Sequence, residues 1–470
     1  MSEPLPFIDA SAREFPSYIS YLLNAEMPYI PLPPAINQLP KELSRKFDLP
    51  VEFTLLTSLI MTSAHIGQSI RLGSCGDCGM PVNLRMAVCF KNRRNLGLLF
   101  RTLGQGIYQS EENLLNSHIR RKGKPLCEEE EKAFVNECIQ KDPKERDGKF
   151  LNEAAQTKQK FEGTIKPHLI FESGSPDELF YQLASSADSG LLMLSDEGLP
   201  LKDFNESYSS SQKSEFLRLM RHSSGLDPIK KSMSKSEWKY APKPLSSVLW
   251  TTDFPTLCTS LKDQSMQETG FWNDFFLMDI QGISELETYR AEVLLESLPE
   301  WQSCINSCYR TRKLSVILIT PDKQSAKILA DFREELLSIL PSFSLEQRPY
   351  VAKWLTNAQK LAVNMQMMGY GGGDFLTAEF TKAGVELAKW IGARTLQLQH
   401  HANHMQHKKD DLRAEEVMLE KLKSKGPIDL RNLCRSYRKQ SKSLHEPVLR
   451  SLISKGLATL GKDELIRVAA

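Results

Sequence analysis

The segment Leu191-Leu192-Met193-Leu194-Ser195-Asp196-Glu197 determines the expected fold. Its short apolar run is followed at once by turn residues, Gly198 and Pro200, a pattern typical of a strand buried on both faces. Such strands belong to parallel sheets that helices cover on both sides. The carboxylates of Asp196 and Glu197 follow the strand, where open α/β sheets bind ligands. The sequence therefore predicts an α/β fold with an acidic pair in its ligand site.

Segments on either side of this strand extend the sheet. Apolar runs at Val82–Phe90, His168–Glu172 and Pro244–Trp250 predict further strands. Ser175-Pro176-Asp177-Glu178 has a serine suited to cap a helix, a proline suited to its first position and a glutamate that completes a capping box. The helix that starts there and runs to about Ala187 joins two strands, so those strands are expected to be parallel neighbours.

A strand–loop–helix unit precedes the acidic pair. The loop 91–95 follows the strand that ends at Phe90, and helical spacing resumes at Leu96. This is the layout of the phosphate loop in P-loop NTPases, in which a residue like Asp196 holds Mg²⁺ and one like Glu197 polarises the attacking water. A working loop needs glycines to cradle the phosphates and a Gly-Lys-Ser/Thr end, and the chain has neither there.

The cations of this loop are Lys91, Arg93 and Arg94. Two interpretations stay open for them. They would bind a phosphate at the start of the following helix, with ATP and Mg²⁺ as the implied cofactors, or they would form a solvated basic turn.

The chain resembles an uncharacterised family from prophages and plasmids whose members often join primase or helicase modules. The resemblance rests on Ser175-Pro176-Asp177-Glu178-Leu179 followed by Leu192–Gly198, and it continues in Leu245–Thr251, the Gly270-Phe271 turn and Thr377–Gln397. It covers about residue 39 to the end. It implies an AAA+/helicase-like ATPase core, with phage or plasmid replication proteins as partners.

The sequence departs from that family pattern at two places. Phe90–Asn95 stands where the family has a Gly-Ser-Gly-Lys-Ser type of loop, and Asp274 stands where the family tends to have an arginine after the Gly-Phe turn. An arginine finger stabilises transition-state charge, whereas an aspartate would repel phosphate. The two departures predict an inactive or weakly active ATPase in which Asp196 and Glu197 are either vestigial or ligands for a nucleotide that is held in a different way.

The expected domains follow from composition and from these motifs. They are a proline-rich arm at 1–38, a degenerate P-loop NTPase-like core at 39–310, a helical lid-like subdomain at 311–410 and a winged helix at 411–470. The core carries a charged helical insertion at 111–163, and the lid-like subdomain carries one strand at Leu314–Ile319.

The C-terminal segment predicts nucleic-acid binding. A helix at Leu412–Lys423, a second at Ile428–Tyr437, a third opened by Ser443–Glu446 and a hairpin at Leu457–Val468 suggest a winged helix. Between residues 431 and 455 the sequence has seven cationic residues and one acidic residue. The cations are Arg431, Arg435, Arg438, Lys439, Lys442, Arg450 and Lys455. This balance suits the phosphates of duplex or single-stranded DNA, with the third helix in the major groove. A winged helix that binds protein instead is the alternative.

Composition limits the remaining possibilities. The net charge is +2 and no apolar run approaches the roughly 18 residues of a membrane span, so no membrane partner is expected. Nine cysteines and a start without a basic signal region indicate reduced thiols in the cytoplasm. Neither the Cys75–Cys78 pair nor the helical group of His400, His404 and His407 supplies a full ligand set, so no metal site is predicted.

These observations favour a nucleic-acid-associated scaffold with a degenerate ATPase core, carried by a mobile element. Two other hypotheses stay open. One is an active Mg²⁺-dependent ATPase with a phosphate site made by Lys91, Arg93 and Arg94. The other is a protein-interaction module that uses the insertion 111–163 and binds no DNA.

Overall fold

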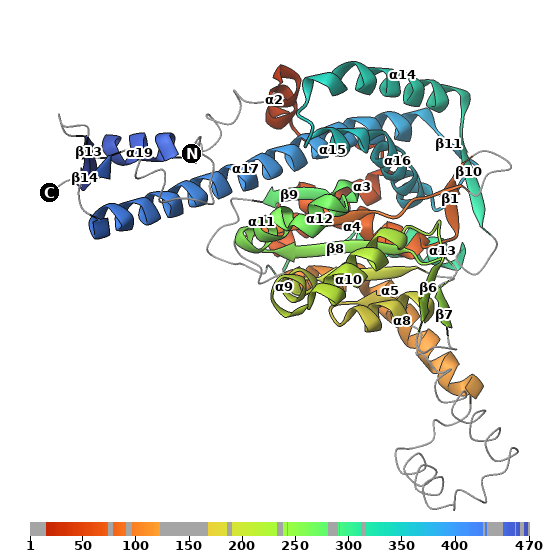
Figure 1. Ribbon diagram of the computed structural model, residues 1–470. Coiled ribbons are helices and arrows are strands. Elements are labelled where there is room, and N and C mark those ends of the chain that lie inside the picture. Colours follow the sequence, from red (N-terminus) through yellow and green to blue (C-terminus); the bar gives the residue numbers. More distant parts are fainter. Residues whose placement is uncertain are drawn as a thin grey trace, which may run out of the picture. The chain divides into compact units, whose positions relative to one another are not determined.

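The structure of the chain is a computed structural model (Figure 1). It describes residues 16–73, 79–90, 96–122, 168–185, 190–232, 238–241, 243–280, 290, 292–311, 316–425, 428–429, 445–455, 457–460 and 465–468. Contacts divide the chain into two compact units, Met1–Leu398 and Gln399–Ala470. Within the described residues, no helix is both long and apolar enough to cross a bilayer.

The first unit is built on a five-stranded parallel sheet in the order β4-β5-β8-β3-β9. The strands are β3 (Arg85–Phe90), β4 (Ile170–Phe171), β5 (Leu191–Ser195), β8 (Ser246–Thr252) and β9 (Phe276–Ile280). Every residue of β3, β5 and β8 is buried, which is why their sequences are nearly continuous apolar runs. The predicted α/β fold on a parallel sheet is confirmed.

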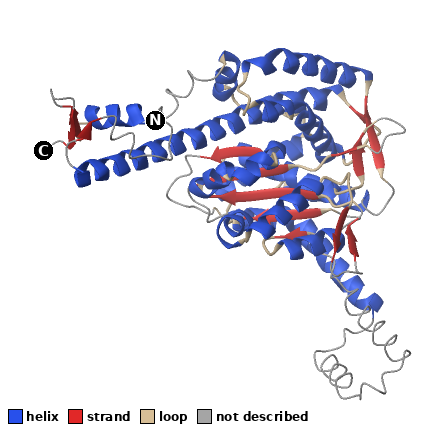
Figure 2. Cartoon of the chain, in the orientation of Figure 1, coloured by secondary structure: helices blue, strands red, loops and turns tan. Residues whose placement is uncertain are grey.

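Helices cover both faces of this sheet (Figures 1 and 2). Successive strand residues point to opposite faces. Leu249 of β8 belongs to the core cluster that contains α3 (Pro34–Phe47), α4 (Val51–Ile66), α5 (Leu96–Lys122) and α13 (Leu298–Thr311). Its neighbour Trp250 stacks on Phe216 of α10 (Ser210–His222) and on Phe271, with ring centroids 6.4 Å apart in each pair. The sheet is therefore the middle layer of three.

A second sheet, in the order β11-β10-β1-β2, belongs to the same unit. Its strands are β1 (Ile70–Leu72), β2 (Met80–Pro81), β10 (Ile317–Pro321) and β11 (Phe375–Leu376), beside α14 (Lys323–Ile339), α15 (Arg348–Ala352) and α16 (Trp354–Tyr370). Ile70 pairs with Ile317 in parallel register. The expected lid-like segment 311–410 thus supplies strands to a sheet that begins near residue 70, and its residues up to Leu398 share the first unit.

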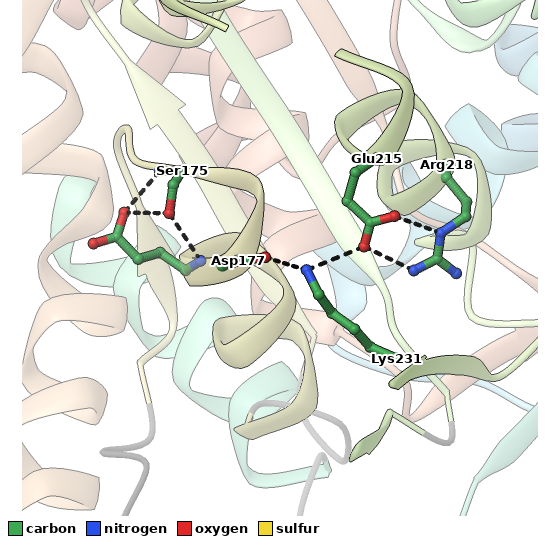
Figure 3. A network of polar contacts seen from close by, with 6 residues as sticks. Ser175, Asp177, Glu215, Arg218 and Lys231 are labelled. Atoms are coloured by element: carbon green, nitrogen blue, oxygen red, sulfur yellow. Dashed lines mark hydrogen bonds and ion pairs between the residues drawn. The ribbon is translucent and has the colours of Figure 1, made fainter. Parts of the chain in front are cut away.

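A network of polar and charged side chains joins two helices and a strand (Figure 3). Ser175 caps α8 (Pro176–Ser185), and its backbone nitrogen donates to Glu178 Oε2 at 2.7 Å, which confirms the predicted capping box. Lys231 of β6 (Ile229–Ser232) forms ion pairs with Asp177 and with Glu215 of α10. The hairpin of β6 with β7 (Trp238–Ala241) is thereby held to both helices.

The C-terminal unit combines the end of α17 (Ala378–Lys425) with β12 (Ile428–Asp429), α19 (His445–Ser454), β13 (Ala458–Leu460) and β14 (Leu465–Val468). The strands form an antiparallel sheet in the order β12-β14-β13. Its core consists of Met418, Leu422, Val448, Leu449, Leu452, Ala458 and Ile466. The hairpin expected at 457–468 is present.

Two expectations for this segment differ from the structure. Ile428 and Asp429 were expected to begin a helix, but they pair with Ile466 and Leu465 as a strand, because β14 offers them a hydrogen-bonding edge. The expected boundary between residues 410 and 411 falls inside α17, which has 48 residues in all and ends at Lys425. The rest of the expected second helix lies outside the described residues.

Close packing of α16 against α17 depends on glycine. A Cβ added to Gly392 would lie 2.3 Å from two ring atoms of the buried Trp354. We expect Gly392→Ala to lower the free energy of unfolding by about 1–3 kcal/mol, since the indole must move within a filled core. Urea unfolding measures this change. Gly372→Ala is the control, because nothing lies within 4 Å of its added Cβ; equal stability of the two variants would contradict the expectation.

Candidate functional site

The strand order puts the topological switch point of the sheet, the expected ligand site, at the carboxyl ends of β3 and β8. These strands are neighbours, but the helices that follow them lie on opposite faces. Leu96 and Leu99 of α5 pack in the core cluster below β3. Helix α11 (Phe254–Lys262), which follows β8, lies on the Trp250 face, where Trp272 Nε1 donates to its Ser260 carbonyl at 3.2 Å. Open α/β sheets bind ligands where neighbouring connections diverge in this way.

The acidic pair stands at this switch point because of the turn after β5. Asp196 is half-buried and Glu197 is exposed. Ser195 Oγ accepts a hydrogen bond from the Leu199 nitrogen at 3.1 Å, at the start of α9 (Leu199–Lys202). Gly198 has φ 65°, and a Cβ there would lie 2.5 Å from Thr252 Oγ1. Only glycine therefore lets this turn lie against the end of β8.

Asp196 reaches the first turn of α5. A Cβ built on Gly97 would lie 2.8 Å from Asp196 Oδ2, so the carboxylate occupies space beside the start of that helix. The phosphate-loop motif has eight positions, with lysine at the seventh and serine or threonine at the eighth. If its first position is Lys91, the first residue after β3, this chain has Gly97 at the seventh position and Leu98 at the eighth. Leu98 is 43% exposed. The position next to Asp196 thus lacks both the lysine charge and the magnesium-binding hydroxyl.

The two polar residues at the end of β8, Thr252 and Asp253, differ in their hydrogen bonding. Asp253 Oδ1 accepts from the Thr256 nitrogen at 2.7 Å, which caps α11 and gives this carboxylate a structural task. Thr252 Oγ1, by contrast, is buried and has no hydrogen-bond partner in the described part of the chain. A buried hydroxyl without a partner costs free energy, and this one lies beside Gly198 at the switch point.

Tyr108 of α5 lies near three acids and one cation. Burial raises the pKa of Tyr108, and Glu172, Glu111 and Asp196 raise it further, against a lowering by Arg101. Glu111 Oε1 also accepts from the Leu169 nitrogen at 2.9 Å, next to β4. A negative field disfavours a polyphosphate, so a nucleotide here would need Mg²⁺ or the loop cations.

Most of the other candidate site residues from the sequence are not described by the structure, or are described only in part. Lys91, Arg93 and Arg94 lie outside the described residues, as do Cys75 and Cys78. His400 lies on α17, but the side chains of His404 and His407 are not described. Where side chains are described, no three His, Cys, Asp or Glu residues come together as a metal site.

Asp274 lies at the edge of the sheet away from Asp196, so the effect expected for it beside the acidic pair does not arise within one chain. It ends η2 (Phe271–Asp274), before β9 begins at Phe276, and therefore lies at the amino edge of the parallel sheet. Asp196 lies at the carboxyl edge. The five residues of β9 alone span about 16 Å between these edges. Asp274 of this chain therefore cannot repel a phosphate bound beside its own Asp196.

The surroundings of Asp274 are unusually basic. Its Oδ1 lies 2.8 Å from Lys353 Nζ. Although burial acts to raise the pKa of Asp274, Arg85, Lys353 and Lys360 lower it below its usual value. Burial lowers the pKa of Arg85, which Asp274 opposes. The sequence analysis did not single out these cations, although an arginine inside the apolar run 82–90 was a signal of a buried charge.

The half-buried side chain of Lys360 predicts a pH dependence of stability. Burial lowers the pKa of Lys360 from 10.5 to about 8. Between these values the unfolded chain binds more protons than the folded chain, so stability rises with pH. We expect wild type to gain about 1–3 kcal/mol relative to Lys360→Met across this window, measured by urea unfolding from pH 7.5 to 10. Lys327→Met, which removes an exposed lysine of α14, should show no such difference. If the free energy of unfolding changed with pH in the same way in wild type and in Lys360→Met, the lowered pKa of Lys360 would be contradicted.

Comparisons with known proteins identify no family for this chain. None of the known protein-family models matches the chain, and no curated protein matches it significantly. Function must therefore be inferred from the chain itself.

Proposed function

We propose that this protein is a degenerate P-loop ATPase-like scaffold that associates with nucleic acid through its C-terminal unit, of the kind that prophages and plasmids carry. The observation that carries the core of this proposal is the contact of Asp196 with Gly97 at the switch point. An acid at the end of one strand meets the first turn of the helix after another, as the chemistry of a P-loop site requires. The lysine that should accompany it is missing.

The missing loop chemistry argues for a scaffold rather than an enzyme. Phosphoryl transfer depends on positioning and on charge stabilisation by the loop backbone, its lysine and Mg²⁺. At 97 and 98 this chain has glycine and leucine. Asp274 lies away from this chain's own Asp196, so within one chain the case for inactivity rests on the loop, while the arginine that the family pattern places after the Gly-Phe turn is still missing.

Two observations favour the alternative of an active Mg²⁺-dependent ATPase. Asp196 and Glu197 stand at the switch point of the sheet, and the hydroxyl of Thr252, next to Gly198, is buried with no hydrogen-bond partner among the residues that the structure describes. Lys91, Arg93 and Arg94 would then supply the charge that the acidic surroundings demand. A protein-interaction role for the insertion 111–163 is the third possibility; its first residues extend α5 to Lys122.

Nucleic-acid binding is proposed from the C-terminal unit. In α19, Val448, Leu449 and Leu452 face the small core while Arg450 is exposed, and Lys455 is exposed just after the helix. An amphipathic helix with outward cations, followed by a hairpin, suits contact with DNA phosphates. Arg431, Arg435, Arg438, Lys439 and Lys442 would add to this surface, but they lie outside the described residues.

The first prediction concerns hydrolysis. We expect the full chain to release phosphate from Mg²⁺-ATP no faster than a protein-free blank, because the loop lacks its lysine and hydroxyl. Glu197→Gln should behave identically, as should Glu346→Gln, which neutralises an exposed glutamate far from the acidic pair in sequence. A phosphate-release assay with an active ATPase as positive control measures this. Turnover that Glu197→Gln abolishes and Glu346→Gln leaves intact would establish the active alternative.

The second prediction concerns DNA. In the full chain, Arg450→Glu with Lys455→Glu should weaken binding to duplex DNA about tenfold at 0.1 M salt and reduce the salt slope by about two phosphate contacts. Fluorescence anisotropy of a labelled duplex over a salt series measures both quantities. Lys323→Glu with Lys327→Glu, which reverses two exposed lysines of α14, is the matched control. Equal losses in the two variants would refute a specific role for the C-terminal unit.

A further inference from the structure

A basic pocket lies at the amino edge of the central sheet, the edge away from Asp196. Its volume is about 200 Å³. It is bounded by the first residue of β3, the last turns of α10, the turn between α12 (Gln264–Glu268) and η2, and Lys353, which precedes α16. The lining residues are Arg85, Leu217, Arg221, Thr269, Gly270, Phe271, Asn273, Asp274 and Lys353.

The central cation of this pocket has unused hydrogen-bonding capacity. Arg85 is only 5% exposed. Its Nη2 donates to the carbonyl of Ser223 at 2.8 Å and to Ser223 Oγ at 3.1 Å. Its Nε is buried without any partner in the described part of the chain. A buried guanidinium with a free donor is costly unless an acceptor completes it, and this one lines the pocket wall.

The pocket holds more positive than negative charge. Arg85, Arg221 and Lys353 stand against the single carboxylate of Asp274. Lys353 is already paired with Asp274 at 2.8 Å. Asp274 also acts on Arg85 through its charge, so one carboxylate offsets three cations and the lining keeps an excess of positive charge. Burial and repulsion from Arg85 and Lys353 also keep the pKa of Lys360 low, at about 8, although Asp274 opposes them.

Size and chemistry together select the ligand. A volume of about 200 Å³ holds only a few water molecules and is below the range of about 300–1,000 Å³ for drug-sized ligands. Guanidinium groups match the tetrahedral oxygens of a phosphoryl group with paired N–H donors. We propose that this pocket binds the phosphoryl group of inorganic phosphate or of a small phosphate ester, between Arg85 and Arg221.

Asp274 sets the strength of this site. It offsets the cations in the empty pocket, which lets Arg85 stay buried, and it repels an incoming dianion. Removing its charge should therefore tighten phosphate binding, whereas a purely structural ion cluster would only lose stability. The sign of this effect separates the two roles. The site is independent of the proposed nucleotide site, since none of its lining residues belongs to that edge.

Titration calorimetry of the full chain with inorganic phosphate, at constant ionic strength and with chloride as the competing anion, tests the proposal. We expect one phosphate per chain. Arg221→Gln, which removes an exposed side chain and should fold normally, is expected to weaken binding at least fivefold. Asp274→Asn should tighten it about three- to tenfold, as one charge a few ångströms away would. Arg333→Gln, an exposed arginine of α14, should leave binding unchanged.

Two further arms complete the experiment. Glycerol phosphate replaces inorganic phosphate in a parallel titration; tighter binding of the ester would identify an organic phosphate as the ligand, and weaker binding would identify the free ion. Glu197→Gln should bind phosphate as wild type does, because it lies at the other edge of the sheet. No measurable binding, or binding that neither Arg221→Gln nor Asp274→Asn alters, would overturn the proposal and would leave the proposed scaffold function untouched.

Discussion

Burial of the parallel sheet on both faces is the constraint on which the rest of this structure depends. Because helices cover each side of β3, β5 and β8, their side chains have almost no contact with water. Polar groups are costly in such a layer unless they are paired. Carboxylates and cations are therefore displaced to the two edges where strands begin and end, and the chemistry of the first unit gathers there.

The two edges of the sheet have opposite electrostatic character. At the carboxyl edge, Asp196 lies near further acids, Glu111 and Glu172, which act on Tyr108 of α5 together with the opposing charge of Arg101. At the amino edge, Arg85, Lys353 and Lys360 surround Asp274. An anion without a metal thus fits the amino edge better, whereas a nucleotide at the carboxyl edge depends on Mg²⁺ or on the cations of the loop 91–95. Asp274 lies at the amino edge, where it is a counter-ion of the surrounding cations, and it does not act on a phosphate bound beside its own chain's Asp196.

Glycines at three close approaches make these arrangements possible. Gly97 leaves room for the Asp196 carboxylate, Gly198 lets the turn after β5 lie on Thr252, and Gly392 admits the indole of Trp354. In the first two cases a side chain would separate the acidic pair from the neighbouring elements. The same small residue therefore positions the candidate site and packs the helices that support it.

Local patterns in the sequence were sufficient for several features. The apolar run before Asp196 predicted a buried parallel strand, and Ser175 with Glu178 predicted a capped helix, because burial and capping are decided by residues close in the chain. The missing Gly-Lys-Ser/Thr was equally visible, since that motif is contiguous. These inferences gave the fold class and half of the candidate site.

The remaining features were decided only by the tertiary structure. Which strands become neighbours depends on long crossovers, so the order β4-β5-β8-β3-β9, and with it the meeting of Asp196 and Gly97, has no local signature. Ile428 and Asp429 became a strand because β14 was there to pair with them. The basic pocket joins Arg85, Arg221 and Lys353, residues more than a hundred positions apart in the chain. Charges so distant in sequence influence one another only after folding has brought them together and excluded the water between them.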